Sequence, residues 1–295
     1  MFTQFFGNYL LNQKLVTSSQ LIDALGQQKS VRLKLGVLAM NAGFMNANQV
    51  DEIHSMQASI DKRFGELAKD KGYLTDVQIT ELLCEQPTRH LLLGQSLVDM
   101  GIMSNDEFEH ALNSYKRLYA LTDGDFTNTK NNKYETTLNE FFQLYHVKNN
   151  TFLLEYLSLL FKNLVRFIGD DFTPLDVRSI ETLPVDYAIS QEIDGKFSVY
   201  SAISCSEESV YELAKRYANE EISAGIDYAL ACICEFLNLH NGLFTVNVSN
   251  LHQVELELNP PNISMDTNLN FESKFYCMPV CFSFGTVDFV LAIKD

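Results

Sequence analysis

The sequence lacks the cysteine spacing of a disulfide framework or a zinc site. Its six cysteines are scattered, without a CxxC pair and without histidine-rich neighbours. Structural zinc sites and the disulfide frameworks of small secreted domains both need cysteines at characteristic spacings. We therefore expect free thiols, no bound metal and a cytoplasmic location.

No apolar run is long enough to cross a bilayer. The longest runs, such as FLLEYLSLLFKNLVRFI, are broken by charges well short of the roughly 20 residues that a spanning helix needs. The N-terminal stretch MFTQFFGNYLLNQK has no basic residues before its apolar ones and no small-residue cleavage site. The sequence predicts neither membrane insertion nor a signal peptide.

Basic residues are too few for a protein that coats nucleic acid. The net charge is −16, with −2 on residues 1–118 and −14 on residues 119–295. Binding along a nucleic acid needs many Lys and Arg side chains facing phosphates. The first fifty residues carry +3, so a small anion would be attracted only near this end of the chain.

Glycines recur at a fixed spacing of 29 residues, at Gly7, Gly36, Gly65 and Gly94. A period of this size is typical of a repeated supersecondary unit. Seven residues after the last three stand Gly43, Gly72 and Gly101, each in the place of a glycine that ends a helix. A short polar residue followed three positions later by Gln or Glu then predicts a capping box in every repeat. These pairs are Thr17 and Gln20, Asn46 and Gln49, Thr75 and Gln78, and Ser104 and Glu107.

Each repeat is therefore predicted to be two short helices, and residues 1–118 an all-α repeat domain. Helix punctuation accounts for the second glycines and the caps. It leaves unexplained the leading glycines, the basic and apolar residues before them, and the glutamines that end three repeats, Gln28, Gln57 and Gln86.

Two stretches of 24 residues, Lys34–Gln57 and Arg63–Gln86, separated by residues 58–62, carry a resemblance to a known family. They resemble the paired motifs of the MshEN domain, the N-terminal domain of type II secretion and pilus assembly ATPases, in its cyclic di-GMP-binding form. The resemblance implies cyclic di-GMP as a regulatory ligand and no required cofactor. The sequence contains no GxxxxGK[ST], so we do not expect the ATPase that usually follows this domain. The candidate ligand-binding residues are Lys34, Leu35, Gly36, Gly43, Gln57, Arg63, Phe64, Gly65, Gly72 and Gln86.

The motifs depart from the family pattern at several positions. Ala39 and Ala68 replace a leucine, Lys34 replaces an arginine that could form a planar fork, and His54 replaces the last leucine. The alternative is a helical scaffold without the ligand. Repeats two and three match the motif best. A ligand pocket between repeats one and two is the alternative to a pocket between repeats two and three.

The remainder of the chain predicts a second domain of different character. Residues 119–136 are rich in Asn, Thr, Asp and Gly and are interpreted as a linker, and residues 137–295 as an α+β domain. DYAISQEIDGKFSVYSAIS predicts a hairpin around Asp194 and Gly195. Two helices are expected next, followed by strands that include GLFTVNVSN and a terminal hairpin around Gly285.

From about residue 150 this order resembles CheX-like domains of the bacterial chemotaxis phosphatase family, with a mainly antiparallel sheet and long helices. The family's helical ExxN motif, often followed by xxxG, corresponds to Glu235, Asn238 and Gly242 in EFLNLHNG. The resemblance implies that the Asn orients a water for attack on a receiver aspartyl-phosphate and that the Glu pairs with the receiver's lysine. Ala231 stands where the family often has Asp or Ser. His240 and Asn241 are expected at the end of this helix.

Two functions follow. The first is a cyclic di-GMP-responsive signalling protein whose CheX-like domain dephosphorylates, or docks, a CheY-like response-regulator receiver through Glu235 and Asn238. The second is a non-enzymatic effector or adaptor of a motility, pilus or secretion system, with the CheX-like domain used for homodimerisation or docking; Ala231 favours this function somewhat.

Overall fold

The computed structural model describes residues 2–28, 30–84, 88–119 and 151–294. Contacts divide the chain into two compact units, residues 1–131 and 132–295. The predicted linker, 119–136, lies outside the described residues except for Tyr119, and so does the predicted start of the second domain up to residue 150. The boundaries of that linker therefore stay a prediction.

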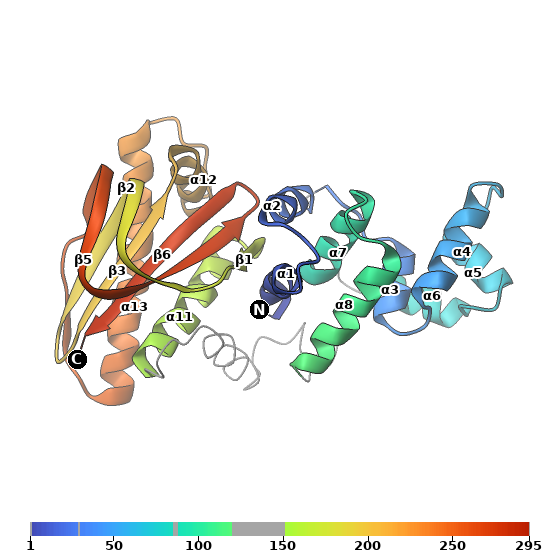
Figure 1. Ribbon diagram of the computed structural model, residues 1–295, viewed down its shortest axis with the longest axis horizontal. Coiled ribbons are helices and arrows are strands. Elements are labelled where there is room, and N and C mark those ends of the chain that lie inside the picture. The colour runs from blue at the N-terminus through green and yellow to red at the C-terminus, as the bar shows by residue number, and fades with distance from the viewer. Residues whose placement is uncertain (1, 29, 85–87, 120–150, 295) are drawn as a thin grey trace. The chain divides into compact units, whose positions relative to one another are not determined.

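The described part of the first unit consists of helix pairs. Within each pair, a turn of a few residues separates a first helix from a second one. In chain order the helices are α1 (Phe2–Asn12), α2 (Ser18–Gln27), α3 (Leu35–Asn41), α4 (Ala47–Gln57), α5 (Phe64–Asp70), α6 (Asp76–Cys84), α7 (Arg89–Asp99) and α8 (Asn105–Leu118) (Figure 1).

A residue in the left-handed conformation follows the first helix of each pair. Gly43, Gly72 and Gly101 have φ angles of 70°, 75° and 69°, and Lys14 takes the same place in the first pair with φ 58°. Glycine reaches this region without a Cβ clash, which is why it commonly ends helices. The predicted helix-ending glycines are confirmed.

All four predicted capping boxes are present. In each one the N-cap side chain accepts from the backbone N–H three residues on, whose own side chain accepts from the N-cap N–H. The N-caps stand 29 residues apart, and they are Thr17, Asn46, Thr75 and Ser104.

Two of the leading glycines, Gly36 and Gly94, let the two helices of a pair approach closely. A Cβ at Gly36 would lie 2.8 Å from Val50, and a Cβ at Gly94 would lie 2.0 Å from the Phe108 ring. Real Cβ atoms do not come this close to a neighbour, so only glycine fits without a shift. The neighbour stands 14 positions after its glycine in three repeats: Val50 after Gly36, Ile79 after Gly65 and Phe108 after Gly94.

The helix pairs do not pack in the order of the sequence. α3 and α4 contact α5 and α6, and they also contact α7 and α8, while α7 contacts α1 and α2. Rings gather between the first and last pairs, where Phe6 lies 5.3 Å from Tyr115 and 6.2 Å from Phe108. The fourth pair therefore contributes to the core of the unit, and the third pair packs on the second.

The described part of the second unit is α+β. Its helices are α11 (Thr151–Asn163), which continues into the π-helical turn η1 (Leu164–Ile168), α12 (Glu207–Ala218) and α13 (Ile226–His252). Its strands are β1 (Phe172–Pro174), β2 (Arg178–Gly195), β3 (Ser198–Cys205), β4 (Leu256–Leu258), β5 (Asn262–Phe282) and β6 (Gly285–Lys294).

The six strands form one antiparallel sheet in the order β1-β5-β6-β3-β2-β4. The predicted hairpins are confirmed, since β2 pairs with β3 across Asp194 and Gly195 and β5 pairs with β6 at Gly285. The long strand β5 also pairs with β2, so that β5, β6, β3 and β2 form a closed ring of hydrogen-bonded neighbours.

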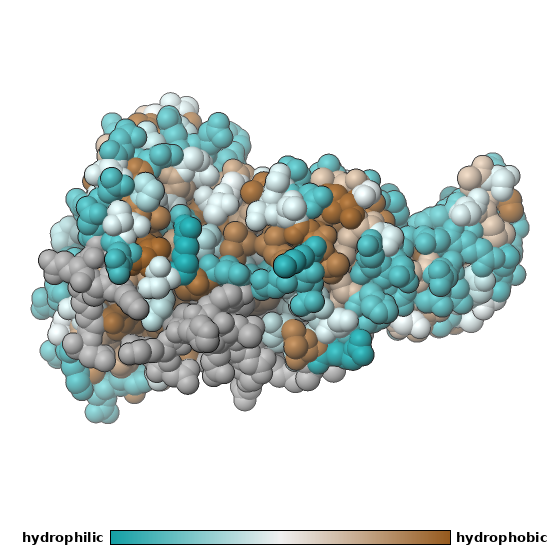
Figure 2. Space-filling model, viewed as in Figure 1, coloured by the Kyte–Doolittle hydropathy of each residue, from teal (hydrophilic) through white to brown (hydrophobic). Residues whose placement is uncertain are grey.

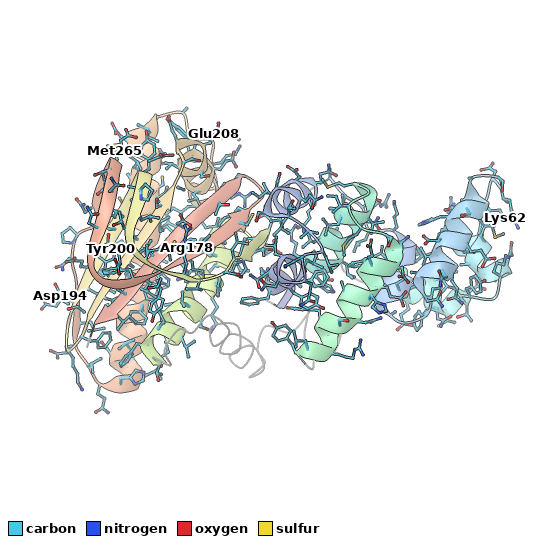
Figure 3. The ribbon with its side chains drawn as sticks, viewed as in Figure 1. Lys62, Arg178, Asp194, Tyr200, Glu208 and Met265 are labelled. Carbon is cyan, nitrogen blue, oxygen red and sulfur yellow. The ribbon has the colours of Figure 1, made fainter. Side chains whose placement is uncertain are left out.

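Apolar residues cover both sides of the sheet. Between the ring-forming strands lies a cluster that includes Leu183, Phe275 and Val290, with the Tyr200 ring of β3 packed 5.1 Å from Phe275 (Figure 3). The helices lie on the other side, where α13 contacts β2, β4, α11 and α12 (Figure 1). Helix α13 is thus one layer of the core, with a stripe left exposed.

One predicted strand, GLFTVNVSN, is wrong. These residues continue α13 as far as His252, and the helix ends at Gln253 in the left-handed conformation. Phe244 and Val248, four positions apart, are both buried, as on one face of a helix. Packing of this face overrides the strand preference of the β-branched residues.

Contrary to the prediction that no apolar run is long enough to cross a bilayer, one helix of the described residues, α13, is long and apolar enough by length and composition. Half of its most apolar window is buried inside the unit. Its apolar residues therefore have a partner in the sheet and in α11.

Candidate functional site

The candidate catalytic pair lies on the exposed stripe of α13. Glu235 and Asn238 are both exposed, as are Asp227 and Ala231 on preceding turns of the same face. Residues three and four positions apart are neighbours on a helix surface. The opposite face is buried in the core through Leu230, Ile233, Phe236 and Leu237.

Glu235 presents an exposed carboxylate. Its carboxylate has no hydrogen-bond or ion-pair partner among the residues that the structure describes. Burial raises the pKa of the Cys234 thiol, and the nearby Glu235 carboxylate raises it further. An unpaired carboxylate at the surface can accept a charge-assisted hydrogen bond from a lysine of a partner protein.

The Asn238 side chain is held from below by the sheet. Its Oδ1 accepts a hydrogen bond from Nε2 of Gln191, at 2.9 Å. Gln191 lies on β2 and is 1% exposed. The exposed side-chain amide of Asn238 is therefore held by the buried side-chain amide of Gln191.

A chain of buried polar groups continues beneath Gln191. Its Oε1 accepts from Nδ2 of Asn241 at 2.8 Å, and Asn241 Oδ1 accepts from the Tyr156 hydroxyl of α11 at 2.8 Å. Asn241 Nδ2 also lies 2.9 Å from Oγ of Ser201, which in turn donates to the Gln191 carbonyl. Buried polar groups stay in a core when they are hydrogen-bonded in this way.

His240 and Asn241 do not end the helix, contrary to the sequence prediction. Both lie in mid-helix and are fully buried. Burial lowers the pKa of His240 to about 3, so the ring is neutral and its Nδ1 accepts from Asn163 Nδ2 at 3.0 Å. The ring also packs edge-on against Tyr156, 4.4 Å between centroids. His240 is thus a core residue rather than an acid or base.

The structure holds no candidate metal centre in its described residues. No three His, Cys, Asp or Glu side chains of residues 2–28, 30–84, 88–119 and 151–294 come together as a metal ion would require. The α13 stripe itself presents a carboxylate and an amide, those of Glu235 and Asn238.

A second candidate site lies between the second and third helix pairs. An open pocket of about 600 Å³ is lined by Leu35 of the second pair and by residues of the third pair. Four of its lining residues belong to the predicted ligand set: Leu35, Arg63, Phe64 and Gly65. The Arg63 guanidinium has no side-chain partner among the described residues and is exposed.

Charge in this pocket is partly neutralised within the protein. Lys69 and Asp76 form an ion pair across the wall, 2.6 Å apart. Glu66 accepts from the Arg63 backbone N–H at 2.8 Å. Of the two basic side chains that line the pocket, Lys69 is paired and Arg63 keeps its hydrogen-bond donors for a ligand.

Other predicted ligand residues have partners in the fold. The Lys34 ammonium pairs with Asp99 at 2.5 Å, and Gln57 donates to the Lys62 carbonyl at 3.2 Å, which closes the turn between α4 and α5. Gly36 packs against Val50. Gly43 and Gly72 form left-handed turns that do not line the pocket. Gln86 lies outside the described residues.

The Phe64 ring, in the second motif, packs against residues of the first motif. Its ring would lie 3.1 Å from a Cβ at Gly36 and stands 5.3 Å from the ring of His54. Burial lowers the pKa of His54, and the charge of Lys34 lowers it further. His54 therefore occupies an apolar position against the Phe64 ring.

Sequence reasoning missed Gln191 and gave Asn241 no role. Gln191 stands on β2 at an inward position between Ile189 and Ile193. A polar residue at a core position of a strand is the signal that could have identified it. Its partner could not be found from the sequence, because 47 positions separate Gln191 from Asn238.

No family model matches the sequence, and no curated protein matches it. Solved structures are similar to about half of the chain. Chemotaxis protein CheX from Desulfovibrio desulfuricans is 12% identical, with a TM-score of 0.44, and the match covers 49% of this chain and 100% of that one. CheX from Vibrio vulnificus is 14% identical, with a TM-score of 0.43 over 49% of this chain and 100% of that one. CheX of the CheX–CheY complex from Borrelia burgdorferi is 13% identical, with a TM-score of 0.39 over 49% of this chain and 98% of that one. The likeness concerns the arrangement of helices and strands, and the likeness to the MshEN domain stays a prediction from the motifs.

Proposed function

We propose that the second unit binds a phosphorylated response-regulator receiver on the exposed stripe of α13 and hydrolyses its aspartyl-phosphate. The observation that supports this most is the exposure of Glu235 and Asn238 side by side, with the Asn238 amide hydrogen-bonded to Gln191. We infer the type of reaction from the resemblance of the ExxN motif to that of CheX-like phosphatases.

The reaction needs little from this chain beyond position and charge. A water attacks phosphorus, the bond from phosphorus to the aspartyl oxygen breaks, and the products are inorganic phosphate and a free carboxylate. Phosphoryl transfer is accelerated chiefly by positioning and electrostatics, so one amide and one carboxylate are enough. In the proposed complex Asn238 holds the attacking water and Glu235 pairs with a lysine of the receiver.

The decisive measurement is the loss of phosphate from a chemotaxis receiver that has been phosphorylated with acetyl phosphate. Asn238→Ala is expected to slow the hydrolysis about 100-fold, because a misplaced water loses its line of attack. Asn247→Ala is the matched control, since Asn247 is an exposed asparagine further along the same helix. Equal rates for wild type and Asn238→Ala would remove the catalytic role.

Docking without catalysis is the alternative for the same surface. Ala231 puts a methyl group where related helices often have a carboxylate or hydroxyl, and this favours a binding role. In that case the receiver binds with an affinity that depends on Glu235, while its phosphate is lost at the spontaneous rate. Titration of the receiver with Glu235→Gln separates this outcome from the first.

We propose further that the pocket between the second and third helix pairs binds cyclic di-GMP. The supporting observation is that Arg63, Phe64, Gly65 and Leu35 line one pocket, with the Arg63 guanidinium free. A guanidinium can donate in a planar fork to a guanine edge or a phosphate, and it can stack on a base.

Calorimetry with cyclic di-GMP on the full chain tests this proposal. Arg63→Ala should abolish the heat of binding, and Arg117→Ala, an exposed arginine on α8, should leave it unchanged. A wild-type chain that gives no heat at submillimolar ligand would make the helix pairs a scaffold.

A further inference from the structure

A buried amide fixes which atom of the candidate catalytic amide faces the solvent. We propose that Gln191 is a positioning residue that holds Asn238 with its Nδ2 group outward. This proposal rests on the proposed phosphatase function of α13 for its purpose, but not for its geometry. Nothing in the ExxN motif itself contains this residue, which lies on β2.

The direction of the hydrogen bonds is anchored at a backbone carbonyl. Gln191 lies 2.7 Å from the carbonyl oxygen of Asn259, which can only accept. The Gln191 atom at this place must therefore be the donor, Nε2. The same Nε2 lies 2.9 Å from the Asn238 side chain, so the atom of Asn238 that faces it must be the acceptor, Oδ1.

The other end of Gln191 supports the same orientation. Its Oε1 can only accept, so the neighbouring atom of Asn241, 2.8 Å away, is Nδ2. The Oδ1 of Asn241 then faces the Tyr156 hydroxyl, which donates to it at 2.8 Å. Every link from α11 to α13 through β2 is satisfied in one direction only.

The pinned amide has a chemical consequence. Because Oδ1 is turned inward, Asn238 presents two N–H donors to a bound receiver. Donors bind the oxygen of a water or of a phosphoryl group, while the carboxylate of Glu235 can only accept. The stripe thus offers a fixed donor beside an acceptor, and a freely rotating amide would present its donors for only part of the time.

The geometry can be tested without any reaction, by side-chain amide relaxation in nuclear magnetic resonance. The order parameter of the Asn238 amide should be above about 0.6 in the wild type and should fall below about 0.6 in Gln191→Met, as for a flexible group. Methionine has a similar length and shape but cannot donate. Ser283→Ala, which removes a hydrogen bond elsewhere in the same unit, is the control and should leave the Asn238 amide rigid.

The kinetic test uses the receiver phosphorylated with acetyl phosphate. Gln191→Met should lower kcat about 10- to 100-fold with little change in KM, because orientation matters most in the transition state. Gln191→Glu carries only acceptors at this place, so it should turn the Asn238 amide over and lower kcat at least as much. Ser283→Ala should leave both kcat and KM unchanged. If general destabilisation lowered kcat, Ser283→Ala would lower it as well.

The possible outcomes separate the two claims. A wild-type chain with a rigid Asn238 amide but no hydrolysis overturns the proposed function and supports the positioning. An Asn238 amide that is equally ordered in wild type and in Gln191→Met overturns the positioning, whatever the rate of hydrolysis. A mobile amide in Gln191→Met together with an unchanged kcat overturns the role of this positioning in the reaction.

Discussion

At the scale of single residues, the same residue type serves different ends according to what surrounds it. Gly43 supplies a left-handed turn and has no atom within 4 Å of a built Cβ, whereas Gly94 supplies room for the ring of Phe108. His54 is half-buried against a ring, and His240 is fully enclosed. Surroundings of this kind come from tertiary packing, and they decide what a substitution will do.

The first prediction concerns the leading glycine of the fourth repeat. Gly94→Ala places a Cβ 2.0 Å from Phe108, a neighbour that is itself fully buried and cannot move aside. Overpacking of this kind costs typically about 1–3 kcal/mol, occasionally more. Urea unfolding followed by circular dichroism should show this loss.

Gly65→Ala is the matched control for that substitution. Its Cβ would meet Leu35 at 3.2 Å and Ile79 at 3.4 Å, distances that a small shift of a side chain relieves. A loss as large as that of Gly94→Ala would mean that the glycines share some other requirement.

The second prediction concerns the acid stability of the second unit. The pKa of His240 is lowered from 6.5 to about 3 by burial, so the unfolded chain binds a proton that the folded one refuses. The stability that depends on the neutral ring is present above pH 6.5 and is lost as the pH falls from there towards about 3. His240→Asn, which keeps an acceptor near Asn163, should make the acid side of the stability profile shallower by up to about 1.4 kcal/mol per pH unit.

The measurement is the free energy of unfolding in urea over that range of pH and above it. His110→Asn removes an exposed histidine and should leave the slope unchanged. A slope that is the same in His240→Asn and wild type would mean that the buried ring is protonated in the folded state.

At the scale of elements, local signals were read correctly and the length of α13 was not. Capping boxes and left-handed glycines act within a few residues, and the sequence therefore predicts the turns of the first unit. FTVNV alternates like a strand, but Phe244 and Val248 also lie one helical turn apart. A short run of this kind fits both periods, and only the packing against α11 and the sheet decides between them.

The third prediction tests this half of α13. Phe244→Ala should cost about 3–5 kcal/mol, because the ring is buried 5.1 Å from Tyr156. Val246→Ala, two positions on and 56% exposed, should leave stability unchanged or raise it by up to about 0.5 kcal/mol, since alanine favours a helix over valine. A loss of stability in Val246→Ala would favour a strand here, as the sequence first indicated.

At the scale of the whole molecule, the two units differ in how much of their structure is determined by local sequence patterns. The helix pairs are local, and the sequence could predict them from one period. The sheet brings together Phe172 and Phe282 and closes β2 on β5, and no local pattern contains such pairings. The candidate site shares this difference, because a local motif indicates Glu235 and Asn238 on one helix, whereas no local motif indicates Gln191 beneath them.

A buried ion pair joins three distant segments of the second unit. Arg216 of α12 contacts both carboxylate oxygens of Asp171, at 2.7 Å and 3.0 Å, and Ser283 donates to the same carboxylate at 2.7 Å. The guanidinium also lies over the ring of Phe284, 4.5 Å from its centroid. Asp171 thus joins the start of β1 to α12 and to the turn before β6.

The fourth prediction follows from the burial of this pair, whose side chains are 12% and 5% exposed. Arg216→Ala should cost about 3–5 kcal/mol, because it removes the bidentate guanidinium from the buried Asp171 carboxylate. The adjacent Lys215→Ala removes an ion pair with Glu221 whose side chains are 42% and 82% exposed, and it should cost about 0–1 kcal/mol. Urea unfolding of the two variants, with the double variant of Asp171→Ala and Arg216→Ala, measures the coupling directly. If Arg216→Ala costs no more than Lys215→Ala, the pair does not fasten the three segments; if the double variant is more stable than Arg216→Ala alone, the cost lies in the stranded charge, as the burial of Asp171 implies.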